Sequence, residues 1–184
     1  MRLLRVDDRT RLRPVELTDA GMLFTMVDAN RAYLRKWMPW VHSTVSDQDT
    51  LAFIETSLAG RDSGVGFDFV IERDTEPCGV IGLSRIDEHN RIGSLGYWLR
   101  EDRQGHGLVT ASCMALIGLG FDELNLNRIT LAAAIDNHRS RAVAERLGFV
   151  LEGTLREAEW INDHFVDHAL YSLLKRDWDD RNAR

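Results

Sequence analysis

The spacing of apolar and polar residues changes several times in the first third of the chain. Residues 9–15 alternate and predict a strand. Thr18 is expected to cap a helix with one apolar face, and residues 31–38 predict a second, short helix that a proline ends. Ser46-Asp-Gln-Asp resembles a capping box, and it opens a third helix that we expect to end at Gly60.

The rest of the chain continues with strands and then alternates strand and helix. The predicted strands cover residues 67–73, 78–86, 92–99 and 128–135, the predicted helices cover 108–121 and 139–147, and a final hairpin covers 149–161 and 165–174 with a turn at Asn162-Asp163. Seven strands in this order predict an α/β (α+β) fold, with a mixed sheet and helices on both of its faces.

Composition limits the class of protein. The chain has 184 residues, of which 44% are hydrophobic and 28% are charged, so one soluble globular domain over residues 1–184 is expected. No apolar run approaches the roughly 18 residues of a membrane span, and the N-terminus has no apolar core like that of a signal peptide. Cys78 and Cys113 fall in a predicted strand and a predicted helix, which indicates reduced core thiols of a cytoplasmic protein. The net charge of −6 argues against nonspecific nucleic-acid binding but leaves a ribosomal substrate open.

The clearest chemical signal lies between the predicted strand 92–99 and the predicted helix 108–121. The sequence there reads Gln-Gly-His-Gly, from Gln104 to Gly107, directly before the helix. Glycines allow a positive φ and close approach of a ligand, and a helix N-terminus offers free N–H groups to an anion. No lysine follows as in a nucleotide P-loop, and Thr110 stands where a dinucleotide fingerprint has its third glycine. The turn therefore predicts a site for a phosphorylated cofactor of another kind.

Three segments carry a resemblance to a known family. Gln104-x-x-Gly107-x-Val109 resembles the Q/R-x-x-G-x-G/A pyrophosphate loop of the GNAT superfamily of acetyl-CoA-dependent N-acetyltransferases, from which Val109 departs at the last position. Asn137-x-x-Ser140, followed by Gly148-Phe149, resembles a second segment of that family, although the same residues are also ordinary helix start and stop signals. Residues 153–174 are similar to the end of the ribosomal-protein N-acetyltransferases, the RimJ/RimL branch.

The resemblance implies a mostly antiparallel sheet and acetyl-CoA as the cofactor. Its pyrophosphate would rest on backbone amides of the turn, with His106 lending only its N–H, and its pantetheine arm would lie along the strand end and near the second segment. The implied cofactor residues are Trp98, Leu99, Gln104, Gly105, His106, Gly107, Leu108, Val109, Asn137 and Ser140.

Acetyl transfer to an amine needs a neutral amine, a donor for the oxyanion and a proton for the leaving thiolate. By the spacing seen in that branch, Glu159 is the candidate base, although it could also be a solvated carboxylate or the partner of an arginine. Ser140 is the candidate acid at the CoA sulfur, and Tyr171 is its rival unless it is a core aromatic. The oxyanion donor is expected to be a backbone N–H near Leu99, where the family's fourth strand splays at a bulge.

The acceptor is the least determined part. Trp37, Trp40 and Trp160 are expected to line its entrance, although the segment around Trp37 could instead plug the core. The preferred acceptor is the N-terminal amine of a protein, possibly a ribosomal one, in direct transfer through a ternary complex. The alternatives are a small amine (a polyamine, an antibiotic or an amino acid) and a noncatalytic acyl-CoA-binding protein.

Three further expectations concern charge, metals and assembly. Carboxylates in the groove, such as Glu157 or Asp163, would favour a cationic acceptor. His164 and His168 lie about 13 Å apart on a strand, too far to chelate one ion, so no metal is expected. The chain is expected to be a monomer or a homodimer, with neither nucleic acid nor membrane as a direct partner.

Overall fold

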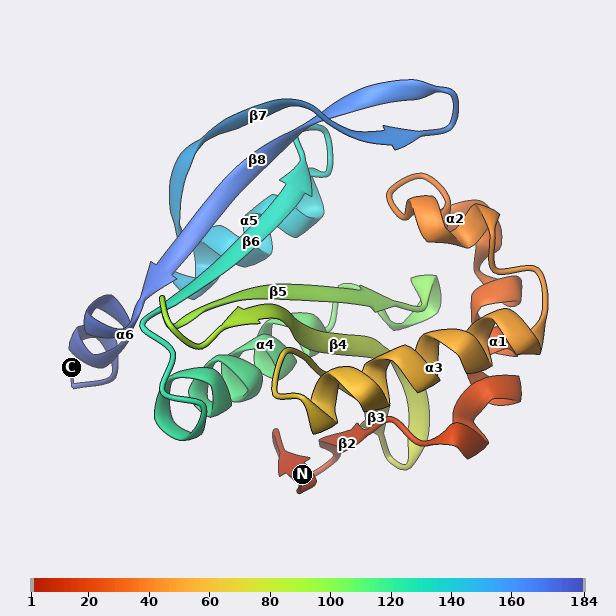
Figure 1. Cartoon of the computed structure of the whole chain (residues 1–184), viewed down its shortest axis with the longest axis horizontal. Coiled ribbons are helices and arrows are strands. Elements are labelled where there is room, and N and C mark those ends of the chain that lie inside the picture. The colour runs from red at the N-terminus through yellow and green to blue at the C-terminus, as the bar shows by residue number, and fades with distance from the viewer. Residues whose placement is uncertain (1, 184) are drawn as a thin grey trace.

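The computed structural model describes residues 2–183, which form one mixed sheet with helices on both faces (Figure 1). The eight strands run in the order β1-β2-β3-β4-β5-β6-β8-β7, and all neighbours are antiparallel except β5 and β6. The strands are β1 (Leu4–Arg5), β2 (Thr10–Pro14), β3 (Phe67–Arg73), β4 (Glu76–Asp87), β5 (Ile92–Leu99), β6 (Arg128–Ala134), β7 (Val150–Ile161) and β8 (His164–Leu174). The predicted class is confirmed, but the predicted count of seven strands is wrong, because β1 is too short to show an alternating pattern.

The helices fall into two layers. The apolar residues of α1 and α3 pack with Val70 and Val80 on one face of the sheet, and those of α4 and α5 pack with Phe69 and Ile81 on the other. The helical elements are η1 (Leu17–Asp19), α1 (Ala20–Ala29), α2 (Arg31–Leu34), η2 (Pro39–His42), α3 (Asp47–Asp62), η3 (Glu101–Arg103), α4 (Leu108–Gly118), η4 (Leu119–Glu123), α5 (His138–Leu147) and α6 (Lys175–Asn182). In the part of the chain that the structure describes, none of them is long and apolar enough to cross a membrane.

Several predicted helix ends move by a turn. Thr18 caps nothing: it lies inside η1, and α1 begins after Asp19, whose carboxylate accepts from the Glu16 amide and the Arg13 guanidinium. The capping box at Ser46 is confirmed, but α3 runs past the predicted end at Gly60. The left-handed residue that stops this helix is Gly64, with φ of 77°.

The opening of the sheet lies between β5 and β6. These strands pair in parallel only from Ile92 to Ser94 on β5, and beyond Ser94 they diverge (Figure 1). The expected splay is therefore present, but the bulge expected near Leu99 is not. The register between β4 and β5 is regular from Gly79↔Leu99 to Ser84↔Ser94 and shifts only after Ser84, where Arg85 has a positive φ.

Both cysteines are buried free thiols, Cys78 on β4 and Cys113 on α4, as the sequence predicts. Burial raises the pKa of each thiol, because a thiolate is poorly solvated in the core.

Candidate active site

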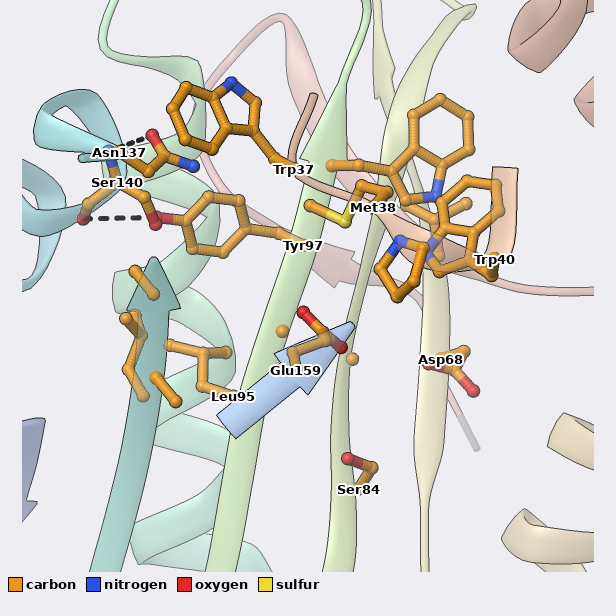
Figure 2. A pocket seen from close by; sticks show the side chains of 18 of the residues that line it. Trp37, Met38, Trp40, Asp68, Ser84, Leu95, Tyr97, Asn137, Ser140 and Glu159 are labelled. Atoms are coloured by element: carbon orange, nitrogen blue, oxygen red, sulfur yellow. Dashed lines mark hydrogen bonds between the residues drawn. The ribbon is translucent and has the colours of Figure 1, made fainter. Parts of the chain in front are cut away.

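The splay between β5 and β6 opens into a cavity of about 600 Å³, which Figure 2 shows from close by. Its walls come from β3 to β6, from α1, α3 and the segment around η2, and from the start of α5 and the final hairpin. Six of the residues singled out in the sequence line this cavity: Trp37, Trp40, Trp98, Asn137, Ser140 and Glu159.

The glycine turn lies outside the cavity lining, between η3 and α4. Gly105 and Gly107 have φ of 81° and 73°, a conformation that side-chain-bearing residues rarely adopt. Gly107 is the N-cap of α4, and no side chain caps that helix end. A Cβ at either glycine would meet nothing within 4 Å. The backbone here is therefore open to a ligand, and the first amides of α4 are free to bind an anion.

The side chains of residues 104–109 differ in what they contact. Gln104 accepts a hydrogen bond of 2.7 Å from Nη1 of Arg139 on α5, and His106 is exposed. The Leu108 side chain is 3% exposed and belongs to the core, against which Val109 packs. Leu108 and Val109 can therefore serve a ligand only through their backbone amides.

Leu99 likewise turns its side chain into the core, where it is 5% exposed. Its neighbour Trp98 faces the cavity and stacks against Trp40, with ring centroids 6.0 Å apart. Because successive residues of a strand point to opposite faces, only the backbone of Leu99 can contribute to a cofactor site.

Asn137 and Ser140 meet β5 at one end of the cavity. Oδ1 of Asn137 accepts from the Ser140 amide at 3.2 Å and so caps α5. The Ser140 hydroxyl is hydrogen-bonded to the Tyr97 hydroxyl at 2.8 Å (Figure 2). Burial raises the pKa of Tyr97, more than the hydrogen bond to Ser140 lowers it. The phenol is therefore protonated at neutral pH.

Glu159 lies on β7, just after an irregularity in its pairing with β8. The register shifts between Leu155 and Glu159, and the Glu159 side chain lines the cavity. Its Oε2 lies 3.3 Å from Nε2 of His168 on β8. Neither of the alternatives considered for Glu159 describes it. The carboxylate is half-buried rather than fully solvated, and within residues 2–183 it lies against a histidine and makes no salt bridge to an arginine.

Trp37 and Trp40 form one side of the cavity, the tryptophan wall. Arg31 fixes it by donating to the carbonyls of Val41 and Thr44, at 2.6 and 2.7 Å. Trp37 and Trp40 belong to this wall, but Trp160 does not: it is 53% exposed and stacks edge-on against Phe165, outside the cavity lining. Trp160 lies outside the lining because Glu159 faces inward and the next residue of a strand faces outward, and its part in the acceptor entrance stays a prediction.

Tyr171 lies in the core, apart from the cavity lining. It is 1% exposed, receives a hydrogen bond of 3.0 Å from Arg141, and donates one of 3.2 Å to Glu145. Its alternative description as a core aromatic is the one that fits. Glu157 and Asp163 also lie outside the cavity lining, so the carboxylates expected there are not these two.

The sequence analysis assigned no part in the reaction to several polar residues of the cavity, among them Tyr97, His168 and Asp68. His168 was considered only as a metal ligand, and residues 2–183 contain no group of three or more histidine, cysteine, aspartate or glutamate residues that could hold a metal. Asp68 does carry a signal in the sequence. It alternates with Phe67 and Phe69 as if it faced water, but Val70, which shares its face, is apolar too.

Comparison with known proteins identifies the family to which this chain belongs. The model of the family described as acetyltransferase (GNAT) domain matches residues 9–150. The chain belongs to the GNAT acetyltransferases. The predicted N-acetyltransferase class and its cofactor, acetyl-CoA, are thereby confirmed for this GNAT chain.

The relatives of this GNAT acetyltransferase include ribosomal-protein acetyltransferases, as predicted. It is 35% identical to the putative ribosomal N-acetyltransferase YdaF of Bacillus subtilis, over 95% of this chain and 96% of that protein. It is 31% identical to the ribosomal-protein-serine acetyltransferase of Escherichia coli, over 93% and 96%. A solved structure of RimL, the ribosomal L7/L12 alpha-N-protein acetyltransferase, in complex with coenzyme A superposes with a TM-score of 0.93 at 27% identity, over 97% of this chain and 100% of that one.

Proposed function

We propose that this GNAT acetyltransferase transfers acetyl from acetyl-CoA directly to the N-terminal amine of a protein in the cytoplasm, with Glu159 as the base and Ser140 as the acid. The observation that carries the proposal is that Glu159 on β7 and Ser140 on α5 line the same cavity (Figure 2). The ribosomal-protein acetyltransferases among its relatives support the choice of acceptor.

In this proposal the pyrophosphate binds the amides of residues 104–109, and the pantetheine arm enters the splay between β5 and β6 beside Asn137. An α-amino group has a pKa of about 7.7–8.0, so near neutral pH it must lose a proton before it attacks. Glu159 takes that proton directly or through a water, and the amine nitrogen then bonds to the thioester carbon. The nitrogen of the tetrahedral intermediate still carries two protons. As the intermediate collapses, the C–S bond breaks, the sulfur receives the proton of the Ser140 hydroxyl, and the Ser140 oxygen regains a proton from that nitrogen, directly or through a water. The products are the N-acetylated acceptor and free coenzyme A.

The test follows free thiol release from acetyl-CoA with ribosomal-protein N-terminal peptides, polyamines and aminoglycosides as acceptors. Glu159→Gln is expected to lower kcat about 10²- to 10⁴-fold, the usual effect of losing a general base. Glu157→Gln is the matched control, because it removes a carboxylate from the same strand but outside the cavity lining. Turnover with small amines alone would contradict the protein acceptor. Acetyl-CoA binding without thiol release on any acceptor would favour a noncatalytic binding protein.

A further inference from the structure

The mechanism above leaves one carboxylate of the cavity without a role. Asp68 on β3 lines the cavity, and in Figure 2 it lies on the side away from Ser140. Within residues 2–183 Asp68 makes no ion pair, and its hydrogen-bond partner is the buried Ser57 hydroxyl on α3. Burial raises the pKa of Asp68, which the Ser57 hydrogen bond opposes. A carboxylate removed from water without a cation is unfavourable, so this position favours a ligand that supplies one.

The strand register places Asp68 beside an open position on β5. Asp68 lies opposite Gly82 on β4, and Gly82 lies opposite Gly96 on β5, so the three positions share one face of the sheet. A Cβ at Gly82 would overlap Oδ1 of Asp68, and a Cβ at Gly96 would meet nothing within 4 Å. The Asp68 carboxylate therefore extends over Gly82 on β4. It lies one strand spacing, about 5 Å, from the open position at Gly96 on β5.

A second polar group faces the same cavity without a partner. Thr50 on α3 is 5% exposed, and among the described residues its Oγ1 has no hydrogen-bond partner. A buried hydroxyl without a partner has lost its hydration without compensation, and a ligand can supply the missing hydrogen bond. The cation that the chain itself brings to this lining is Arg85, whose side chain is exposed and makes no ion pair with Asp68 in residues 2–183. The need for a cation near Asp68 is thus not met from within the described part of the chain.

We propose that Asp68 and Thr50 form an acceptor subsite that binds a second cationic group of the acceptor, on the side of the cavity away from Ser140. The acceptor is then an ammonium- or guanidinium-bearing amine: a peptide whose N-terminal residue is followed by lysine or arginine, or a polyamine. This inference rests on the proposed function and specifies its substrate class. Asp68 determines specificity and takes no part in proton transfer.

The test compares acceptors that differ only in the second group. A Ser-Lys peptide is paired with its Ser-norleucine analogue, and diaminooctane is paired with aminooctanol. Wild type is expected to have at least tenfold higher kcat/KM for the cationic member of one pair or of both, and the pair that shows this identifies the source of the cation. In Asp68→Asn this preference disappears. The kcat/KM for the cationic acceptor falls about ten- to a hundredfold, as for the loss of a charged hydrogen bond, while the kcat/KM for the neutral acceptor and the KM for acetyl-CoA stay unchanged.

Two further variants separate binding from folding. Thr50→Val, which keeps the shape of the side chain, is expected to lower kcat/KM a few-fold, and only for the cationic acceptor. Asp180→Asn, which removes the same charge from the exposed face of α6, is expected to change nothing. Wild type without a preference for either cationic member, or an equal loss on both members in Asp68→Asn, would overturn the inference and leave the transfer activity standing. No thiol release with any acceptor would overturn the proposed function and this inference with it.

Discussion

At the scale of single residues, the site pairs each proposed catalytic group with one neighbour on an adjacent element. Glu159 contacts His168, and Ser140 contacts Tyr97. A serine hydroxyl alone is a weak acid toward a thiolate whose conjugate thiol has a pKa of about 8.5. The hydrogen bond between the Tyr97 and Ser140 hydroxyls holds the Ser140 side chain in one rotamer, so we expect Tyr97 to position Ser140.

Tyr97→Phe tests this arrangement, because it removes one oxygen and keeps the ring. We expect kcat to fall about tenfold, with little change in the KM for acetyl-CoA, since the phenol acts through Ser140 and does not hold the cofactor. The loss should not add to that of Ser140→Ala, and the double variant should be no slower than Ser140→Ala alone. Steady-state kinetics of the two single variants and the double variant measure this coupling.

Tyr33→Phe is the control for removing a phenol from the same part of the molecule, and it should leave kcat unchanged. Tyr33 packs against the cluster of Val27, Leu34 and Val41 beneath the tryptophan wall. Additive losses in the double variant would show that Tyr97 acts independently of Ser140.

At the scale of elements, the position of α1 depends on a buried ion cluster. Arg13 on β2 donates to Asp19, which begins α1, at 2.8 and 2.9 Å, and to Glu72 on β3 at 2.9 Å. Both carboxylates are 6% exposed, and Asp19 raises the pKa of Arg13. Since Leu23 and Val27 of α1 line the cavity, the cluster also fixes one wall of the site.

Arg13→Met should destabilise the protein by about 3–5 kcal/mol, because it leaves buried carboxylates without their shared cation. Arg5→Met, which breaks a salt bridge to Asp8 on the exposed surface, should cost less than about 1 kcal/mol. Urea unfolding of both variants gives the two values. Equal effects would mean that water or Arg11, which also pairs with Glu72, replaces the missing guanidinium.

The sequence predicted the elements better than their contacts. Local signals are enough to predict the helix start at Ser46, because four consecutive residues form its capping box. They are also enough to predict the turn at Gly107, because that turn needs a positive φ. They do not show that β8 lies between β6 and β7, because strand order depends on packing across the whole sheet. The same reason explains why the contacts within the site were missed. The motif located Ser140, but its partner Tyr97 lies on a strand more than forty residues earlier, and no local pattern predicts that contact.

At the scale of the whole molecule, few backbone contacts join the two halves of the sheet. Only the three pairs from Ile92↔Arg128 to Ser94↔Thr130 connect β5 to β6, and beyond them the cavity lies between the diverging strands. A cofactor seated in the splay and on the glycine turn contacts both halves. Because it binds only the folded state, it should stabilise the protein by about 2.7 kcal/mol at a hundred times its Kd. For a chain of this size, that is a rise in Tm of roughly 5–11 °C.

Gly107→Ala separates the contribution of the turn from that of the fold. The new methyl group meets no protein atom, so its effect without ligand is the strain of a positive φ, on the order of 1 kcal/mol. With coenzyme A, the methyl group stands at the N-cap of α4, where we expect the pyrophosphate to approach, so most of the ligand-induced rise in Tm should vanish. Gly148→Ala is the control, because Gly148 also has a positive φ, at the end of α5, and its new Cβ would have to displace only the flexible end of the Arg181 side chain. Both variants should melt below wild type without ligand, and only Gly148→Ala should regain the full rise with it. An undiminished rise in Gly107→Ala would mean that coenzyme A is held by the splay alone, and the anion site at the start of α4 would have to be abandoned.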